Sequence, residues 1–239
     1  MSRDVIIEEV NPIENMKHTV LCGFSGPGFL GNTALMYITR SKNLELKARV
    51  RSRLLPPSVI LVEGRPVNPF RIYSDDSGML FVVSEARISP ENSWTIGLKL
   101  MEWLLVQGVK EFMTIEPMVI NAPLEEIPVY GFSVPSRDLT EYGVKPLTEG
   151  GVSGLNAVLF EEAFERHIPW TTFVVPTSLA SYVDYGGTAA VIEVLNRMYK
   201  LGVDVSLLKR SDEMRQQLTE KMRSQEERRG FLGSLRRKR

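Results

Sequence analysis

The sequence predicts an α/β protein: a three-layer domain in which helices cover both faces of a mixed sheet, followed by a C-terminal helical tail. Three observations lead to this prediction. Short apolar runs of strand length alternate with amphipathic helical segments along residues 1–205. Three such runs follow one another closely across residues 59–83, which favours an antiparallel hairpin region. Residues 206–229 then carry many charges and too narrow an apolar face to bury a helix in a core.

The strands are predicted from short apolar runs bounded by turn residues. Residues 18–24 are almost continuously apolar, which is typical of a strand covered on both faces. Residues 75–78, Asp-Asp-Ser-Gly, form a turn between two runs, because glycine accepts a positive φ and aspartate caps its own backbone. The predicted strands are 5–10, 18–24, 44–50, 59–62, 69–73, 79–83, 110–115, 127–132 and 170–175, with 139–146 as a connection.

Helical spacing of apolar residues predicts four helices in the domain. The first spans residues 33–40 and follows a glycine loop, so that strand, loop and helix form one unit. The second is expected to begin with Ser93 as its N-cap, and the third near Leu155, after a second glycine loop. The fourth follows Asp184, which we expect to cap it. Strands alternating with helices in this way favour one domain with helices on both faces of its sheet.

The composition is that of an ordinary globular protein, with 239 residues of which 43% are hydrophobic and 24% charged. It excludes the disordered and collagen-like classes. No apolar run approaches the roughly 20 residues that cross a bilayer, and the polar start carries no secretory signal. We therefore expect a cytoplasmic protein that does not enter a membrane.

The net charge of zero conceals an asymmetry between the body and the tail. The chain has 29 basic and 29 acidic residues, but residues 209–239 hold 11 basic and 5 acidic ones, a net charge of +6. Residues 1–208 hold the other 18 and 24, a net charge of −6. This polarity favours a tail that docks on an acidic surface of another copy or of a partner. A solvated helix with a basic end would explain it equally well.

Cysteine and histidine are too scarce for several mechanisms. Cys22 is the only cysteine, and a lone thiol cannot form an internal disulfide. Its apolar neighbours predict a buried strand rather than an activated nucleophile. With only His18 and His167 in addition, a closed zinc site would lack ligands. We expect no metal.

The first glycine loop carries the sharpest enzymatic signal. Residues 26–31, Gly-Pro-Gly-Phe-Leu-Gly, match G-x-G-x-x-G between a strand and a helix, where a dinucleotide pyrophosphate would sit on the helix N-terminus. Pro27 removes one N–H donor, however, and the next strand offers no acidic residue for a ribose hydroxyl. It carries Arg49, Arg51 and Arg53 instead, which are typical of a solvated edge but would also suit a 2′-phosphate. We favour a structural role for the loop, the close packing of the first helix on the sheet.

The second glycine loop, residues 149–155, would bind an anion by the same physics of a helix N-terminus, but a tight turn between strand and helix is the simpler interpretation. Nucleotide or nucleoside binding remains the alternative function. The glycines that would carry it are Gly26, Gly28, Gly31, Gly151 and Gly154.

Other candidate catalytic groups do not converge. Ser25 resembles the nucleophile of a G-x-S-x-G elbow, but Pro27 stands in place of the second glycine, and His167 lies in a polar turn. The acidic pairs at 75–76, 125–126 and 161–162 are adjacent in sequence on solvated segments, unlike paired catalytic carboxylates. These observations favour a protein that is not an enzyme.

The tail, residues 206–239, has the features of a docking element. Its helix bears about two apolar residues per heptad, which suits packing against a neighbour or a coiled seam. Gly230 is expected to end the helix, and the apolar and basic residues after it form either a docking segment or a disordered terminus. The predicted partner-binding residues are Leu207, Met214, Leu218, Met222, Phe231, Leu232, Leu235, Arg236, Arg237, Lys238 and Arg239.

Three stretches taken together resemble the proteasome assembly chaperone 2 family, in its archaeal branch. The resemblance spans residues 20–205 and depends on the order and spacing of the stretches. They are the glycine-rich opening at 23–31, the loop and helix at 150–157 continuing to Arg-His-Ile-Pro at 166–169, and Pro-Thr-Ser at 176–178 through Asp184, Ala-Ala at 189–190 and Leu-Gly-Val-Asp-Val at 201–205.

This resemblance implies a fold related to nucleoside phosphorylases, a homo-oligomer, and a chaperone or adaptor role on the proteasome core particle without catalysis. Archaeal members of the family are thought to engage the α-subunit ring through a flexible C-terminal tail, and some such tails have a penultimate tyrosine. This chain instead ends Leu-Arg-Arg-Lys-Arg at 235–239. An ATP-grasp-like role, attributed to some members, would need a lysine and an acidic metal-binding set that we do not identify here.

The leading hypothesis is therefore a non-enzymatic homo-oligomeric chaperone or adaptor. Its expected partners are further copies of itself and proteasome α subunits or the core particle, bound through the tail. We expect no cofactor, no membrane and no specific nucleic acid as a partner. The alternatives are a nucleotide- or nucleoside-binding enzyme that uses the loop at 26–31, and a structural homo-oligomer without a foreign partner.

Overall fold

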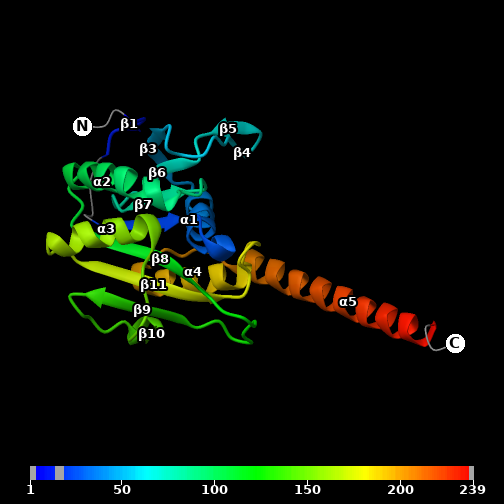
Figure 1. Cartoon of the computed structure of the whole chain (residues 1–239). Coiled ribbons are helices and arrows are strands. Elements are labelled where there is room, and N and C mark those ends of the chain that lie inside the picture. The colour runs from blue at the N-terminus through cyan, green and yellow to red at the C-terminus, as the bar shows by residue number, and fades with distance from the viewer. Residues whose placement is uncertain (1–3, 14–18, 237–239) are drawn as a thin grey trace.

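The structure, a computed structural model, describes residues 4–13 and 19–236, and side chains as far as residue 222. A nine-stranded mixed sheet runs through the body, and one long helix projects from it at the C-terminal end (Figure 1). Helices lie on both faces of the sheet. The predicted fold class, a three-layer α/β domain with a C-terminal helical tail, is confirmed.

Nine strands form close to the predicted positions, and two more form at 65–67 and at 144–146, where the sequence predicts no strand. They are β1 (Val5–Glu9), β2 (Thr19–Phe24), β3 (Glu45–Ser52), β4 (Ile60–Val62), β5 (Arg65–Val67), β6 (Phe70–Ser74), β7 (Leu80–Ser84), β8 (Glu111–Val119), β9 (Val129–Val134), β10 (Val144–Pro146) and β11 (Trp170–Thr177). The helices are α1 (Leu30–Ser41), α2 (Pro90–Val106), α3 (Gly154–Glu165), α4 (Tyr185–Tyr199) and α5 (Ser206–Arg236), with short 3₁₀ turns at Pro27–Phe29 and Thr140–Tyr142.

The large sheet has the strand order β1-β3-β6-β7-β2-β8-β11-β9-β10. Its centre, from β7 to β11, is parallel. β6 and β7 pair antiparallel, as predicted for the runs at 69–73 and 79–83, and β3 and β1 add further antiparallel pairs outside them. At the other edge β9 runs antiparallel to β11 and β10 runs parallel to β9. The hairpin β4-β5 stands apart as a sheet of its own (Figure 1).

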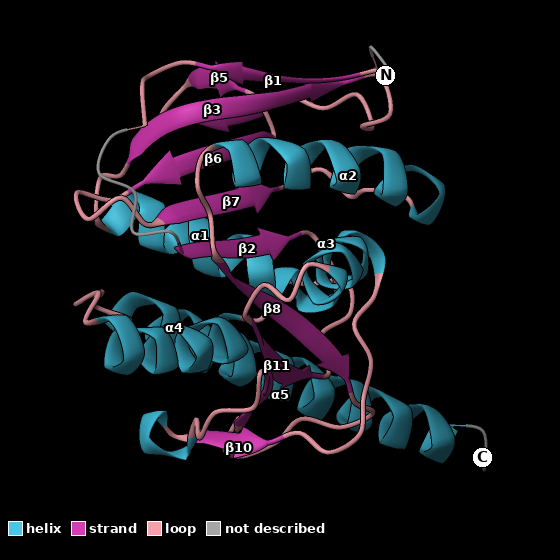
Figure 2. Ribbon diagram, turned by 90° about the vertical axis from the view of Figure 1, so that its left-hand side faces the viewer, coloured by secondary structure: helices cyan, strands magenta, loops and turns pink. Residues whose placement is uncertain are grey.

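Two apolar layers hold the helices to the sheet. One layer joins α1 and α4 to one face, and the other joins α2 and α3 to the opposite face (Figure 2). The predicted central strand β2 is buried from Thr19 to Gly23, and Cys22 is fully buried in the second layer. Full burial on both faces explains why this strand reads as a continuous apolar run.

Three helix boundaries differ from the prediction, the first being the start of α1 at Leu30 instead of residue 33. α2 begins at Pro90 after Ser89, not at Ser93, whose buried hydroxyl donates to the Ser89 carbonyl inside the first turn. Proline suits the first turn because its missing N–H has no partner there. α5 continues through Gly230 to Arg236. One glycine weakens a helix by about 1 kcal/mol but keeps its N–H, so it need not end the helix.

The contact between α1 and β2 depends on two glycines that face each other. A Cβ atom on Gly23 would lie 2.2 Å from the carbonyl oxygen of Gly31, and one on Gly31 would lie 3.0 Å from the Phe24 nitrogen. Both obstacles are backbone atoms of packed elements, which cannot move aside independently. The structural role predicted for the first glycine loop therefore agrees with the geometry at Gly23 and Gly31.

A buried polar contact docks α3 on the other face. Glu116 on β8 accepts a hydrogen bond from the Asn156 side chain on α3, and their exposed fractions are 7% and 4%. Burial raises the pKa of Glu116 to about 7, because removal from water penalises the charged carboxylate. The hydrogen bond from Asn156 opposes this shift but is the smaller effect.

The glycine contact yields a stability prediction. Gly23→Ala should lower the free energy of unfolding by about 1–3 kcal/mol, the usual cost of overpacking. Urea unfolding followed by circular dichroism measures this change. Gly151→Ala is the matched control, because an added Cβ there meets no atom within 4 Å and the backbone does not have a positive φ. Equal effects of the two substitutions would contradict the packing argument.

Glu116 yields a prediction about pH. A carboxyl group with a raised pKa in the folded state binds its proton more tightly than in the unfolded state, so it lowers stability as the pH rises from about 4.5 to about 7. Glu116→Gln keeps an acceptor for Asn156 and removes the titration. The stability advantage of this variant should grow by about 2 kcal/mol between pH 5 and pH 8. Denaturation curves at both pH values test this, and a constant difference would show that Glu116 titrates normally.

Candidate functional site

The carboxyl ends of β2, β8 and β11 meet at one edge of the sheet. In open α/β sheets, ligands bind in the crevice outside these ends. The loop at 26–31 follows β2 there, and the end of β11 leads to Asp184 and α4. This edge is therefore where the alternative function would place a nucleotide.

The chain itself fills the crevice beside the loop. Gly28 has φ 66°, and a Cβ atom on it would lie 2.9 Å from the Thr177 hydroxyl and 3.3 Å from Cβ of Asp184. The Asp184 backbone N–H donates to the Gly28 carbonyl at 2.9 Å. The Asp184 carboxylate accepts from the Gly187 N–H at 2.8 Å, which confirms the predicted cap of α4. A pyrophosphate at Gly28 would have to displace these contacts and would meet the negative charge of Asp184.

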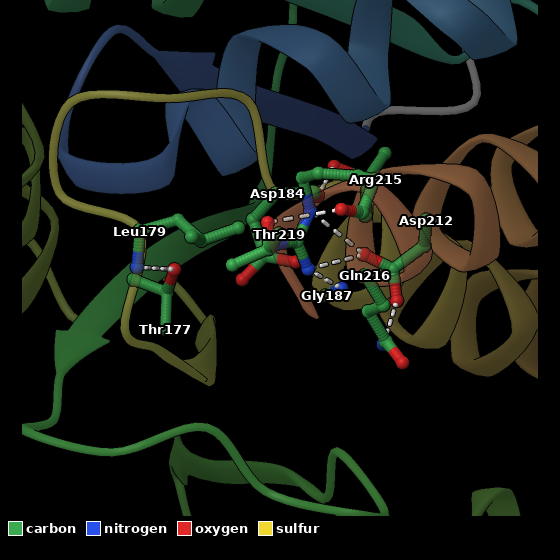
Figure 3. Close-up of polar contacts among 9 residues, drawn as sticks. Thr177, Leu179, Asp184, Gly187, Asp212, Arg215, Gln216 and Thr219 are labelled. Carbon is green, nitrogen blue, oxygen red and sulfur yellow. Dashed lines mark hydrogen bonds and ion pairs between the residues drawn. The ribbon is translucent and has the colours of Figure 1, made fainter. Parts of the chain in front are cut away.

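The N-terminal turns of α5, with Asp212 and Arg215, lie against the same edge of the sheet next to Asp184 (Figure 3). Asp212 is 9% exposed and accepts hydrogen bonds from Arg215 at 2.7 Å and from Gln216 at 2.7 Å. A Cβ atom on Gly186 would lie 2.8 Å from the Asp212 carboxylate, so glycine allows α5 to approach the start of α4. The cavity that remains between β11, α5 and the segment after β8 has a volume of about 30 Å³. That is the space of about one water molecule.

The first turns of α5 are fixed to the body. Leu208 is 4% exposed within the core layer of α1 and α4, and Lys209 forms an ion pair with Glu193 on α4 at 2.5 Å. Residues 216–222 are all exposed, and the helix projects from the body for roughly 30 Å as far as Arg236, at 1.5 Å per residue (Figure 1). α5 is thus a projecting arm with an anchored base.

The structure places part of the predicted partner-binding set on the surface of this arm. Leu207, Met214, Leu218 and Met222 are 61%, 53%, 61% and 64% exposed, and we call these four residues the α5 stripe. Phe231, Leu232, Leu235 and Arg236 lie in the part of α5 whose side chains are not described, and Arg237, Lys238 and Arg239 lie outside the described residues. Helical spacing places these four side chains on one side of α5.

The glycines of the alternative function have structural surroundings of different kinds. Gly26 faces Pro117, Gly28 faces Thr177 and Asp184, and Gly31 faces β2. Gly151 and Gly154 have open space at the Cβ position, and Gly154 has φ 60°. The first loop therefore packs against the fold, whereas the second borders solvent.

The other candidate chemical groups are separate from one another. Cys22 is fully buried, and its burial raises the pKa of the thiol, which disfavours the reactive thiolate. His167 sits at the end of α3 in an exposed turn with φ 56°, its ring nitrogen 3.2 Å from the Phe164 carbonyl. His18 lies outside the described residues. Among the described side chains, those of residues 4–13 and 19–222, no three from His, Cys, Asp or Glu are grouped to hold a metal ion.

Sequence reasoning missed two features of this part of the molecule. Asp212 was not singled out, because a lone aspartate on a charged helix resembles a solvated residue. The apolar groove beside the second glycine loop was also missed, since its residues come from β9, a loop and α3. The pair Gly186-Gly187 could have indicated the position of Asp212, because two residues without bulky side chains let another helix approach closely.

No helix in the described part of the chain is long and apolar enough to span a membrane.

Comparison with known proteins gives one family match and many structural matches. A model of the PAC2 family matches residues 20–222. The chain is similar to PbaA of Pyrococcus furiosus, an archaeal homolog of proteasome-assembly chaperone, with 24% identity, a TM-score of 0.81 and 94% of each chain covered in the monoclinic form. A second PbaA structure has 25% identity and a TM-score of 0.77, and covers 92% of this chain and 97% of that one.

Two further structures extend this similarity. A Thermoplasma acidophilum protein of unknown function has 27% identity and a TM-score of 0.72, over 90% of this chain and 88% of that one. Pyrococcus furiosus PbaB, an archaeal proteasome activator, has 15% identity and a TM-score of 0.79, over 93% and 100%, and so shares the fold. No curated protein matches the sequence. Because the family model covers residues 20–222 of 239, the chain belongs to the PAC2 family.

Proposed function

We propose that this protein is a non-enzymatic chaperone or adaptor of the proteasome, and that it binds proteasome α subunits through α5. The observation that carries the proposal is the α5 stripe, four exposed apolar side chains on an anchored, projecting helix. Similarity to PbaA, an archaeal homolog of proteasome-assembly chaperone, supplies the class of partner. The protein acts in the cytoplasm as a homo-oligomer in this proposal.

Physical arguments support a binding role for α5. Full burial of an apolar side chain contributes about 1.5–3 kcal/mol, so the four residues of the α5 stripe supply enough energy for a stable contact. Anchoring at Asp212 and Leu208 reduces the ordering entropy that a free tail would lose on binding. The basic residues at 236–239 would add electrostatic steering toward an acidic partner.

The chemistry of the sheet edge supports a function without catalysis. Thr177 and Asp184 pack against Gly28 of the first glycine loop. The cavity lined by Thr177, Asp184 and Asp212 has a volume of about 30 Å³. A nucleotide needs a cavity of several hundred Å³. We therefore assign the function of this chain to contacts between macromolecules, with the glycines of the first loop in structural roles.

The proposal predicts the effect of removing part of the stripe. Leu218→Ser combined with Met222→Ser should weaken binding to isolated proteasome α subunits at least tenfold, because two exposed apolar anchors are lost without disturbing the core. Surface plasmon resonance with immobilised α subunits measures the affinity.

Glu213→Ser combined with Glu220→Ser is the matched control. These two glutamates are exposed on the same helix, and helical spacing places them on the side opposite the α5 stripe. The control pair should bind nearly as well as the parent chain. Undiminished binding by the Leu218 and Met222 variant, with an unchanged melting temperature, would show that α5 is not the contact.

A further inference from the structure

An apolar groove lies beside the second glycine loop. It has a volume of about 440 Å³ and is formed between β9, the segment 147–152 and the first turns of α3. Neither the α5 stripe nor the filled crevice at the end of β11 belongs to it. Its apolar lining residues are Phe132, Leu147, Val152, Ala157 and Phe160, and Glu149 stands among them.

Aromatic rings continue the groove along α3. Phe132 meets Phe160 edge-to-face with ring centroids 6.0 Å apart, and Phe164 stacks on Phe160 at 5.9 Å. Phe164 is 53% exposed although it is one of the largest apolar side chains. The ring faces therefore form a track that begins in the groove and opens onto the surface of α3.

The surroundings of this track are acidic. Glu149 lines the groove, and Glu161 and Glu165 are exposed on α3 next to Phe160 and Phe164 in the sequence. Arg166, which directly follows the helix, forms an ion pair with Glu162. Residues 111–205 as a whole hold 13 acidic and 5 basic residues. A ligand with apolar side chains followed by cations would match both the rings and their acidic rim.

The C-terminal end of this chain has that chemistry. Phe231, Leu232 and Leu235 supply apolar side chains, and four consecutive basic residues follow at 236–239. Apolar residues gain burial in an aromatic groove, and arginine is attracted both to carboxylates and to the faces of aromatic rings. Residues 209–239, with a net charge of +6, are therefore attracted electrostatically to residues 111–205, with a net charge of −8.

The groove cannot be filled by the tail of the same chain. α5 leaves the body at its anchored base and continues as one helix to Arg236, on the side away from α3 (Figure 1). A continuous helix holds its end roughly 30 Å from the body. We infer that the groove of one copy receives the C-terminal segment, residues 231–239, of a second copy. The inference does not depend on the proteasome as a partner, and it adds an occupant for the tail when no other partner is bound.

Peptide binding to the full chain tests this inference. The receptor is the full-length protein with Phe231, Leu232 and Leu235 replaced by serine, so that its own tail does not compete. The probe is a fluorescently labelled peptide of residues 229–239, and fluorescence anisotropy reports its binding. We expect saturable binding that weakens when salt rises, because part of the attraction is between the arginines and the acidic rim.

Variants of the groove locate the binding. In the same receptor, Glu149→Lys and Ala157→Arg should each weaken peptide binding at least tenfold, the first by reversing a rim charge and the second by filling the groove with a cation. Glu126→Lys makes the same charge change on an exposed glutamate between β8 and β9 and should leave the affinity unchanged. Circular dichroism checks folding, and Glu149→Lys keeps the test decisive if Ala157→Arg unfolds the chain.

Three outcomes would overturn the inference. The peptide does not bind, or it binds equally well to the groove variants and the parent receptor, or Glu126→Lys weakens it as much as Glu149→Lys. The last result would show general attraction to an acidic surface. None of these assays contains a proteasome subunit, so their failure leaves the proposed role of the α5 stripe to its own test.

Discussion

The close approach of α1 to β2 is the constraint on which the arrangement of this protein depends. Gly23 and Gly31 bring two backbones together at a distance that no side chain would allow. The loop between them is thereby held against the end of β11, where Gly28 meets Thr177 and Asp184. Glycines that would cradle a phosphate in another fold are here committed to packing. The strongest enzymatic motif of the sequence is thus explained by geometry.

The packing of the first glycine loop against Asp184 also helps to position the C-terminal helix α5. Asp184, held next to Gly28, caps α4, and the start of α4 in turn accommodates Asp212 through Gly186. In many α/β enzymes a ligand binds at this edge of the sheet. In this chain the N-terminal turns of α5 pack there instead. A projecting helix with a fixed base presents its apolar side chains in one direction, and such pre-ordering lowers the entropic cost of any contact made through it.

The α5 stripe and the apolar groove beside the second glycine loop differ in how well they can be predicted from the sequence. The α5 stripe could be predicted, because Leu207, Met214, Leu218 and Met222 lie on one helix and their spacing is visible within it. The groove at Phe132 and Phe160 could not, because its walls come from elements that are distant in sequence and are neighbours only in the folded sheet. The burial of Glu116 could not be predicted either, because it depends on the packing of α3, which is distant in sequence.

Local sequence patterns are enough to predict the fold class, nine of the eleven strands, the helices, the cap at Asp184 and the division into an acidic body and a basic tail. These features follow from local patterns: hydrophobic period, turn chemistry and charge counts. The tertiary structure decided the strand order, the start of α2 at Pro90, the continuation of α5 through Gly230 and the role of each glycine loop. Strand order, helix boundaries and the roles of the glycines depend on which backbone atoms pack against one another. This packing is determined by contacts between residues that are far apart in the chain.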